Sequence, residues 1–341
     1  MKDKFLYITL GVFLCLLSGA LFLGYGQPHE TEVAEAARRI IVQDNELYLA
    51  SDAIGSKKLT TNQDIKLLFG EKNGILLVGK GYEELESGNP NTRGTRLSLF
   101  NEDGTEIREI SQKLAQYALF DKGGDNIIYL TPDGKIYQQE TQGGAEKKIA
   151  DHASLPSISP DGKFITYKKM PSDWTPGQYT DGAPGIVVTN IETGEEKIVA
   201  SEEADHASFW SPDGEYIFFY GDNGFGMDSL HVMNSDGSER TLLGNVGKDV
   251  YVPGQMVPSI SEPPIISSDG RFFIYESDRE IWLNEIDLVN KKLIRAKRIG
   301  YGTSPQWIEE GKTLSIVFGG NGKSQNGSLI AVDVDGNIIN K

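Results

Sequence analysis

The chain has 341 residues, of which 33 are lysine or arginine and 49 are aspartate or glutamate, so its formal net charge is −16. This acidic balance argues against nucleic acid as a partner, because neutralising phosphates requires a basic face. With Cys15 as its single cysteine, the chain has no internal disulfide bond and no thiolate metal site. The length accommodates one large all-β domain, and the 39 glycines and 14 prolines indicate many turns.

An uncharged, apolar run covers residues 5–25 and follows Lys2 and Lys4. As a helix it would be roughly 31 Å long, which is enough to span the hydrocarbon core of a bilayer. Lysines before the run and acidic residues after it favour a cytoplasmic N-terminus and a body outside the cytoplasm. Residues 1–26 are therefore expected to contain one transmembrane helix that anchors the chain, and residues 27–38 are expected to form a linker.

A cleaved signal peptide is the alternative interpretation of the same segment. Signal peptides have an apolar core of about 7–15 residues followed by a small-residue cleavage site. The run here is longer, but Ser18-Gly19-Ala20 is small enough to permit cleavage. The protein is expected at a bacterial cell membrane with its body on the outer side, and it would be secreted or periplasmic if the segment is removed.

A short phrase with a large apolar residue four positions before a glycine recurs along the chain. Its copies are Ile158-Ser-Pro-Asp-Gly162, Trp210-Ser-Pro-Asp-Gly214, Ile266-Ser-Ser-Asp-Gly270 and Trp307-Ile-Glu-Glu-Gly311. Each precedes a run rich in β-branched and aromatic residues, which predicts a strand, and the Asp-Gly pair predicts a hairpin turn. Because Trp210 and Trp307 share a position with isoleucines, both are interpreted as core residues rather than as ligand-stacking residues.

Weaker copies of this turn surround Gly74 and Gly124, and a second kind of turn follows later in each unit. The later turns are typified by Asn101-Glu-Asp-Gly104, Asn234-Ser-Asp-Gly237 and Asp333-Val-Asp-Gly336. The repeat length is close to the roughly 40 to 50 residues of a four-stranded propeller blade. Residues 39–341 are therefore predicted to form an all-β propeller of four-stranded antiparallel blades. Seven blades, the first incomplete, are preferred, and six are the alternative.

The unit from Phe209 to Leu243 carries the clearest copies of both turns. The pairing of Trp210-Ser-Pro-Asp-Gly214 with Asn234-Ser-Asp-Gly237 resembles the WD40-like repeat of TolB-type β-propellers. It is also similar to the repeats in the propeller domains of prolyl-oligopeptidase-type enzymes. The resemblance covers residues 39–341 and implies a propeller fold. The sequence has no Gly-x-Ser-x-Gly elbow, no His-Glu-x-x-His and no P-loop, so no motif assigns catalysis or a cofactor.

The tetrapeptide Asp-His-Ala-Ser occurs twice, each time just before the first strand of a unit. Its acid–imidazole pairs are Asp151 with His152 and Asp205 with His206. Loops of this type emerge at one end of a propeller, so both pairs are candidates for a ligand site at the channel mouth. The alternative is a structural loop copied with the repeat, since two histidines make an incomplete metal site.

Asp222 and Asp228 are weak candidates for calcium ligands. Their spacing does not match an EF-hand loop, and a turn is the preferred interpretation. No metal and no other cofactor is therefore predicted.

Three longer insertions, residues 81–96, 168–185 and 245–263, are expected on the same face as the Asp-His loops. Long loops in compact domains often carry function. Aromatic and apolar residues on these loops suit contact with a protein partner or with a small polar or glycan ligand. The binding candidates in the second and third insertions are Trp174, Tyr179, Tyr251 and Met256.

The anchor, the repeats and the face that carries the long loops favour a monomeric, membrane-tethered propeller. It would act as a non-enzymatic interaction or ligand-binding module. The alternative is a hydrolase or lyase that works at the channel mouth through the two Asp-His pairs. One basic run is expected on the outermost strand of its blade, where charge prevents pairing with another sheet. It consists of Lys291, Lys292, Arg295, Lys297 and Arg298.

Overall fold

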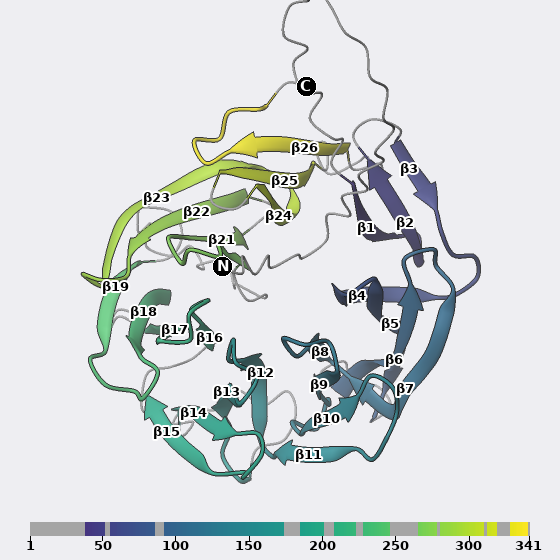
Figure 1. Ribbon diagram of the computed structural model, residues 1–341, viewed down its shortest axis with the longest axis horizontal. Helices are drawn as coiled ribbons and strands as arrows, with labels where there is room; N and C mark the ends of the chain where they lie inside the picture. The colour runs from purple at the N-terminus through teal and green to yellow at the C-terminus, as the bar shows by residue number, and fades with distance from the viewer. Residues whose placement is uncertain are drawn as a thin grey trace, which may run out of the picture.

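The computed structural model describes residues 38–51, 55–85, 92–173, 185–200, 208–222, 228–245, 265–277, 280–309, 312–318 and 328–339. The elements formed by these residues are all β-strands. They are grouped in seven antiparallel sheets, which follow one another around a ring (Figure 1). This arrangement confirms the predicted all-β propeller.

The predicted anchor and linker lie outside the described residues. Within the described ranges, no helix has the length and apolar character that crossing a membrane requires.

Five sheets have four strands each, which run in chain order from the centre of the ring to its outside (Figure 1). Sheet 2 consists of β4 (Ile65–Lys72), β5 (Ile75–Glu84), β6 (Arg93–Asn101) and β7 (Glu106–Ala115). Sheet 3 consists of β8 (Tyr117–Phe120), β9 (Asn126–Leu130), β10 (Ile136–Glu140) and β11 (Lys147–Ala150). Sheet 4 consists of β12 (Ala153–Ile158), β13 (Phe164–Lys169), β14 (Gly185–Asn190) and β15 (Glu196–Ala200).

Sheets 5 and 6 repeat the same order. Sheet 5 consists of β16 (Ser208–Trp210), β17 (Tyr216–Asp222), β18 (Asp228–Asn234) and β19 (Thr241–Asn245). Sheet 6 consists of β20 (Ile265–Ile266), β21 (Phe272–Ser277), β22 (Glu280–Asp287) and β23 (Lys292–Tyr301).

The two sheets at the ends of the chain have three strands each within the described residues. Sheet 1 consists of β1 (Arg38–Gln43), β2 (Glu46–Ser51) and β3 (Gly55–Lys58), and sheet 7 of β24 (Thr303–Glu309), β25 (Thr313–Phe318) and β26 (Ser328–Asp333). Counting each of these two sheets as a blade gives seven blades, and counting the two together as one blade gives six.

The Ser-x-Asp-Gly phrases form the turns between the first and second strands of sheets 4, 5 and 6, which we call the early turns. Gly162, Gly214 and Gly270 have φ values of +74°, +77° and +71°, a left-handed conformation that glycine adopts without steric cost. The serine three residues earlier donates to the aspartate carboxylate and accepts the N–H that opens the next strand. Each early turn is therefore held by its own side chains.

The hydrophobic core lies between neighbouring sheets. Each of six clusters of buried side chains combines residues from two consecutive sheets. In β9, Ile127 and Tyr129 pack with sheet 2, whereas Ile128 and Leu130 pack with sheet 4. Side chains of a strand alternate between its two faces, so a strand buried on both faces has a continuous apolar sequence.

The tryptophans of the repeat lie in this core, as predicted. Trp210 is only 8% exposed and belongs to the cluster between sheets 4 and 5. Trp307 packs against the cluster between sheets 6 and 7.

A cation on the outermost strand of one sheet caps the turn between the third and fourth strands of the next sheet, which we call the late turn. The Nζ of Lys147 in β11 donates to the carbonyl oxygens of Ile191 and Glu192, at 2.6 and 3.2 Å. The same contact recurs around the ring through Arg108 to Glu140 and Thr141, Lys197 to Asp236, and Lys297 to Asp335. These four residues, the rim cations, join neighbouring sheets at the outside of the ring.

The basic run lies on and next to β23, the outermost strand of sheet 6, as predicted. Its charges are paired with acidic side chains: Arg295 with Glu285 and Asp335, and Arg298 with Glu280. The run is therefore largely engaged within the propeller.

The late turns also lie directly against the preceding sheet. Gly237 has φ +84°, and a Cβ placed on it would be 2.9 Å from Val199 Cβ and 3.0 Å from Val199 O. Gly162, in an early turn, has φ +74° and nothing within 4 Å of an added Cβ. The two glycines thus share a backbone requirement and differ in contact with a neighbour.

Replacing each of these glycines by alanine tests the contact between sheets 4 and 5. Gly162→Ala is expected to cost about 1–2 kcal/mol, because it forces an alanine into the left-handed region. Gly237→Ala is expected to cost at least ~1 kcal/mol more, since the methyl group pushes the late turn off β15. Urea unfolding curves of the two variants measure the difference, and equal midpoints would show that this contact does not hold the sheets together.

Candidate functional site

Asp151 and His152 are the predicted site residues whose surroundings the structure describes. They lie between β11 and β12, where the chain passes from sheet 3 to sheet 4. His152 has φ +53°, and its carbonyl oxygen accepts the N–H of Met170 at 2.6 Å. Lys148 Nζ donates to the Asp151 carboxylate at 2.7 Å. Both residues thus make contacts within their own loop and sheets.

The remaining predicted binding residues lie outside the described residues. They are Trp174, Tyr179, Asp205, His206, Tyr251 and Met256. The convergence of the two Asp-His pairs therefore stays a prediction. Asp222 and Asp228 face each other as Cα partners at the end of the β17–β18 ladder. Across the described ranges, no group of three or more His, Cys, Asp or Glu side chains is placed to hold a metal ion.

The first insertion is partly a strand extension and not the loop that the sequence suggested. Strands β5 and β6 continue into it, with Glu83 opposite Gly94 and Glu84 opposite Arg93. Arg96 binds Glu83 through two hydrogen bonds, at 2.6 and 3.0 Å. Cross-strand pairing of this kind stabilises a hairpin, which explains why the strands continue past the edge of the ring.

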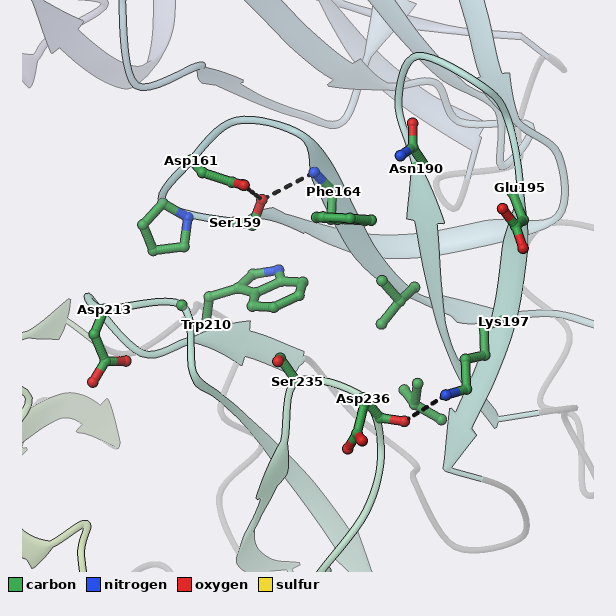
Figure 2. A pocket seen from close by; sticks show the side chains of 14 residues that line it. Ser159, Asp161, Phe164, Asn190, Glu195, Lys197, Trp210, Asp213, Ser235 and Asp236 are labelled. Atoms are coloured by element: carbon green, nitrogen blue, oxygen red, sulfur yellow. Dashed lines mark hydrogen bonds between the residues drawn. The ribbon is translucent and has the colours of Figure 1, made fainter.

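A cleft of about 560 Å³ opens between sheets 4 and 5 (Figure 2). It is bordered by the early and late turns of both sheets. Turns of these two kinds emerge at the end of a propeller opposite to the loops between second and third strands. The cleft is therefore on the face opposite to the one that the sequence favoured for binding.

Apolar side chains form the floor of the cleft, and they come from both sheets. They are Phe164, Val188, Val199 and Trp210. The rings of Phe164 and Trp210 are 6.5 Å apart at an angle of 34°. The Nε1–H of Trp210 is buried and has no hydrogen-bond partner, although a buried unpaired donor costs about 1–3 kcal/mol. The floor thus combines apolar surface with one unsatisfied donor.

Acidic side chains dominate the rim of the cleft. Asp161, Glu195, Asp213 and Asp236 lie around it, with Lys197 as the cation in its lining. Burial acts to raise the pKa of Asp161, but hydrogen bonds from Ser159 and the Lys163 N–H bring it below its ordinary value. Hydrogen bonds from Ser238 lower the pKa of Asp236. Both carboxyl groups are therefore ionised at neutral pH, and the rim is negative.

The cleft is closed at two ends by contacts between the sheets (Figure 2). At one end, Gly214 lies against the ring of Pro160, so that a Cβ on the glycine would be 3.5 Å from Pro160 Cδ. At the other end, Lys197 Nζ donates to the Asp236 carbonyl oxygen at 2.8 Å. The walls are thus held by contacts that belong to the fold, and the shape of the cleft is preformed.

The repeat does not by itself predict this cleft. Trp210 is a core residue and Asp213 is part of a turn, as predicted. The cleft depends on which residue of a neighbouring turn lies next to Trp210. The sequence of a single repeat does not predict that contact, because it is formed by packing between sheets.

Comparison with known proteins identifies the fold. No family model matches the chain. The structure is similar to that of TolB from Acinetobacter baumannii, with a TM-score of 0.51 and 16% identity over 89% of this chain and 78% of that one. It is also similar to an oligogalacturonate lyase in complex with manganese, with a TM-score of 0.58 and 10% identity over 89% and 83% of the two chains.

A third similar structure is dipeptidyl peptidase 4 from Porphyromonas gingivalis. Its TM-score is 0.52, with 12% identity over 89% of this chain and 51% of that one. At these identities the likeness defines the class of fold alone. The chain is a β-propeller like those of TolB and the peptidase, which confirms the resemblance that its repeats indicated.

One strongly perturbed carboxyl group lies away from the cleft. Burial, together with the hydrogen bond and the charge of Glu102, raises the pKa of Glu71, in β4, to about 8. The folded-state pKa is above the ordinary value of 4.5, so the folded protein holds this proton more tightly than the unfolded chain. The resulting stabilisation is complete at low pH and is lost as the pH rises through about 8.

Glu71→Gln is expected to flatten this dependence, because glutamine keeps the shape of the protonated acid and does not titrate. The free energy of unfolding of the native protein should fall between about pH 5 and pH 9 more steeply than that of the variant. Urea unfolding across this range measures the slopes. Glu192→Gln, a change at an exposed turn residue, is the matched control, and a Glu71→Gln slope equal to the control's would contradict the assignment.

Proposed function

We propose that this chain is a non-enzymatic binding module that binds a protein partner in the cleft between sheets 4 and 5. A membrane anchor in residues 5–25 holds it in place, with the propeller outside the cytoplasm. The observation that carries the proposal is the cleft itself, in which a preformed apolar floor lies under an ionised rim.

The composition of the cleft supports binding to a protein. Ligand sites are typically concave and apolar with a few placed polar groups, and tryptophan is enriched among the residues that contribute most to protein interfaces. The walls of the cleft are fixed before binding by the serine–aspartate hydrogen bonds within the early turns and by the contact between Lys197 and Asp236. A preformed site loses little conformational entropy when a partner enters, which favours affinity.

The membrane part of the proposal rests on the apolar run and its flanking charges. A variant with Cys15→Ser and a single cysteine at the exposed position Ile107 tests it. A membrane-impermeant maleimide is expected to label Ile107→Cys in intact cells and to label Asp3→Cys, before the span, only after lysis. The full-length chain should sediment with membranes. Labelling of both positions only after lysis would contradict the outer location, and a shortened chain in the soluble fraction would indicate cleavage.

A photo-activated cross-linking residue at Glu195, on the exposed rim of the cleft, tests the binding part. Cells that make this full-length variant are expected to give one discrete covalent adduct, because a partner in the cleft lies within reach of the rim. The matched control carries the same residue at Ile107, which is exposed on the outer strand of sheet 2. Denaturing electrophoresis and mass spectrometry identify the adduct. The absence of an adduct at Glu195, or the same adduct at Ile107, would refute a binding cleft.

A further inference from the structure

One backbone position recurs at or just after the end of the third strand in sheets 3 to 7, and we call the residue there the plug residue. Its N–H donates to the carbonyl oxygen of the residue that follows the glycine between the first and second strands of the same sheet, at 2.8 to 3.0 Å. The plug residues of sheets 3 to 7 are Thr141, Ile191, Ser235, Ile286 and Val334.

Apolar plug residues fill their gaps. Ile191 is 7% exposed and belongs to the cluster between sheets 3 and 4. Ile286 is 2% exposed and belongs to the cluster between sheets 5 and 6, and Val334 packs against the cluster between sheets 6 and 7. Ser235 is the plug residue of sheet 5, and it lines the cleft. A serine has neither the volume nor the apolar surface of these three residues.

The gap between sheets 6 and 7 shows what the cleft would be with an apolar plug. Its floor has the same pair of rings, Phe272 and Trp307, 6.2 Å apart. Its outer end has the same contact, from Lys297 to the Asp335 carbonyl oxygen. Trp307 also has an unpaired Nε1–H, but here the apolar plug residue Val334 packs against the same cluster as Trp307. The cleft over Trp210 therefore lies where an apolar plug residue would be, and the small polar Ser235 occupies that position instead.

Charge and hydrogen bonding indicate what enters this site. Four acidic side chains surround it, and its cation, Lys197, already donates to the Asp236 carbonyl oxygen. A basic side chain satisfies the rim with its cation and covers the apolar floor with its aliphatic stem.

We propose that the cleft takes an arginine side chain from the protein partner, with its stem in the place that Ile286 and Val334 fill in their own gaps. Arginine is favoured over lysine because its planar guanidinium binds carboxylates through two hydrogen bonds. This inference rests on the proposed binding function and specifies the chemistry of the partner.

Blocked tripeptides test the proposal on the full-length chain in detergent. The probes are acetyl-Gly-Arg-Gly-amide and its norleucine and glutamate analogues, and the signal is the ¹⁹F resonance of 5-fluorotryptophan at Trp210, assigned with Trp210→Phe. The arginine peptide is expected to shift this resonance saturably, and less at high salt. The norleucine peptide should bind at least about tenfold more weakly, and the glutamate peptide should give no shift. Equal shifts from the arginine and glutamate peptides would overturn the proposal.

Ser235→Ile gives sheet 5 the plug residue found in sheets 4 and 6 and is expected to weaken binding of the arginine peptide at least about tenfold, whereas Ser235→Ala should bind as the native chain does. Urea unfolding midpoints no lower than that of the native chain confirm that both variants fold. Native-like binding by Ser235→Ile would overturn the proposal, as would a shift caused by a neutral oligosaccharide and not by the arginine peptide. If the arginine peptide causes no shift but the Glu195 adduct still forms, the arginine inference is wrong and the proposed binding function is retained. If the peptide causes no shift and no adduct forms, both proposals are wrong.

Discussion

Packing between neighbouring sheets is the interaction on which this fold depends. Sheets 2 to 6 each pack against a neighbour on both faces, and the chain has no disulfide bond to hold the ring. Burying a large apolar side chain contributes about 1.5–3 kcal/mol, and each of the six clusters joins two sheets through several such residues. The rim cations and the late turns add polar contacts at the outside of the same interfaces. Neighbouring sheets are thus held by similar contacts at several places around the ring.

Repetition of one interface allows a single gap to change without loss of the fold. Between sheets 4 and 5 the apolar cluster, the ring pair of Phe164 and Trp210, and the Lys197 contact are all present. Only the plug residue departs from the apolar type seen in sheets 4, 6 and 7. The stability lost at Ser235 is local, because five other clusters and the neighbouring rim contacts remain. A binding site can therefore arise from one substitution in a repeat that is otherwise structural.

The sequence predicted the fold because the signals for it are local. Early turns follow from Ser-x-Asp-Gly, in which serine, aspartate and glycine act within five residues. The late turn at Asp287 has no glycine, and Lys291 there takes the left-handed conformation at φ +48°. The cleft could not be predicted in this way. It requires Ser235 of one turn to lie beside Trp210 and Asp161, and those neighbours are set by packing between sheets. The extension of β5 and β6 escaped prediction because glycines and charged residues there resemble a loop.

The acidic surface of the cleft follows from how the ring uses its cations. Arg108, Lys147 and Lys297 donate to carbonyl oxygens of the next sheet, and Lys197 does the same at the cleft itself. A hydrogen bond to a carbonyl oxygen does not neutralise a carboxylate, although Lys297 also forms an ion pair with Asp335. In a chain with 49 acidic and 33 basic residues, cations placed at turns leave acidic turn residues in excess. The early turns need an aspartate for their own geometry, so acidic groups recur on the turn face. A gap that opens on this face therefore has a negative rim, and a basic side chain complements it.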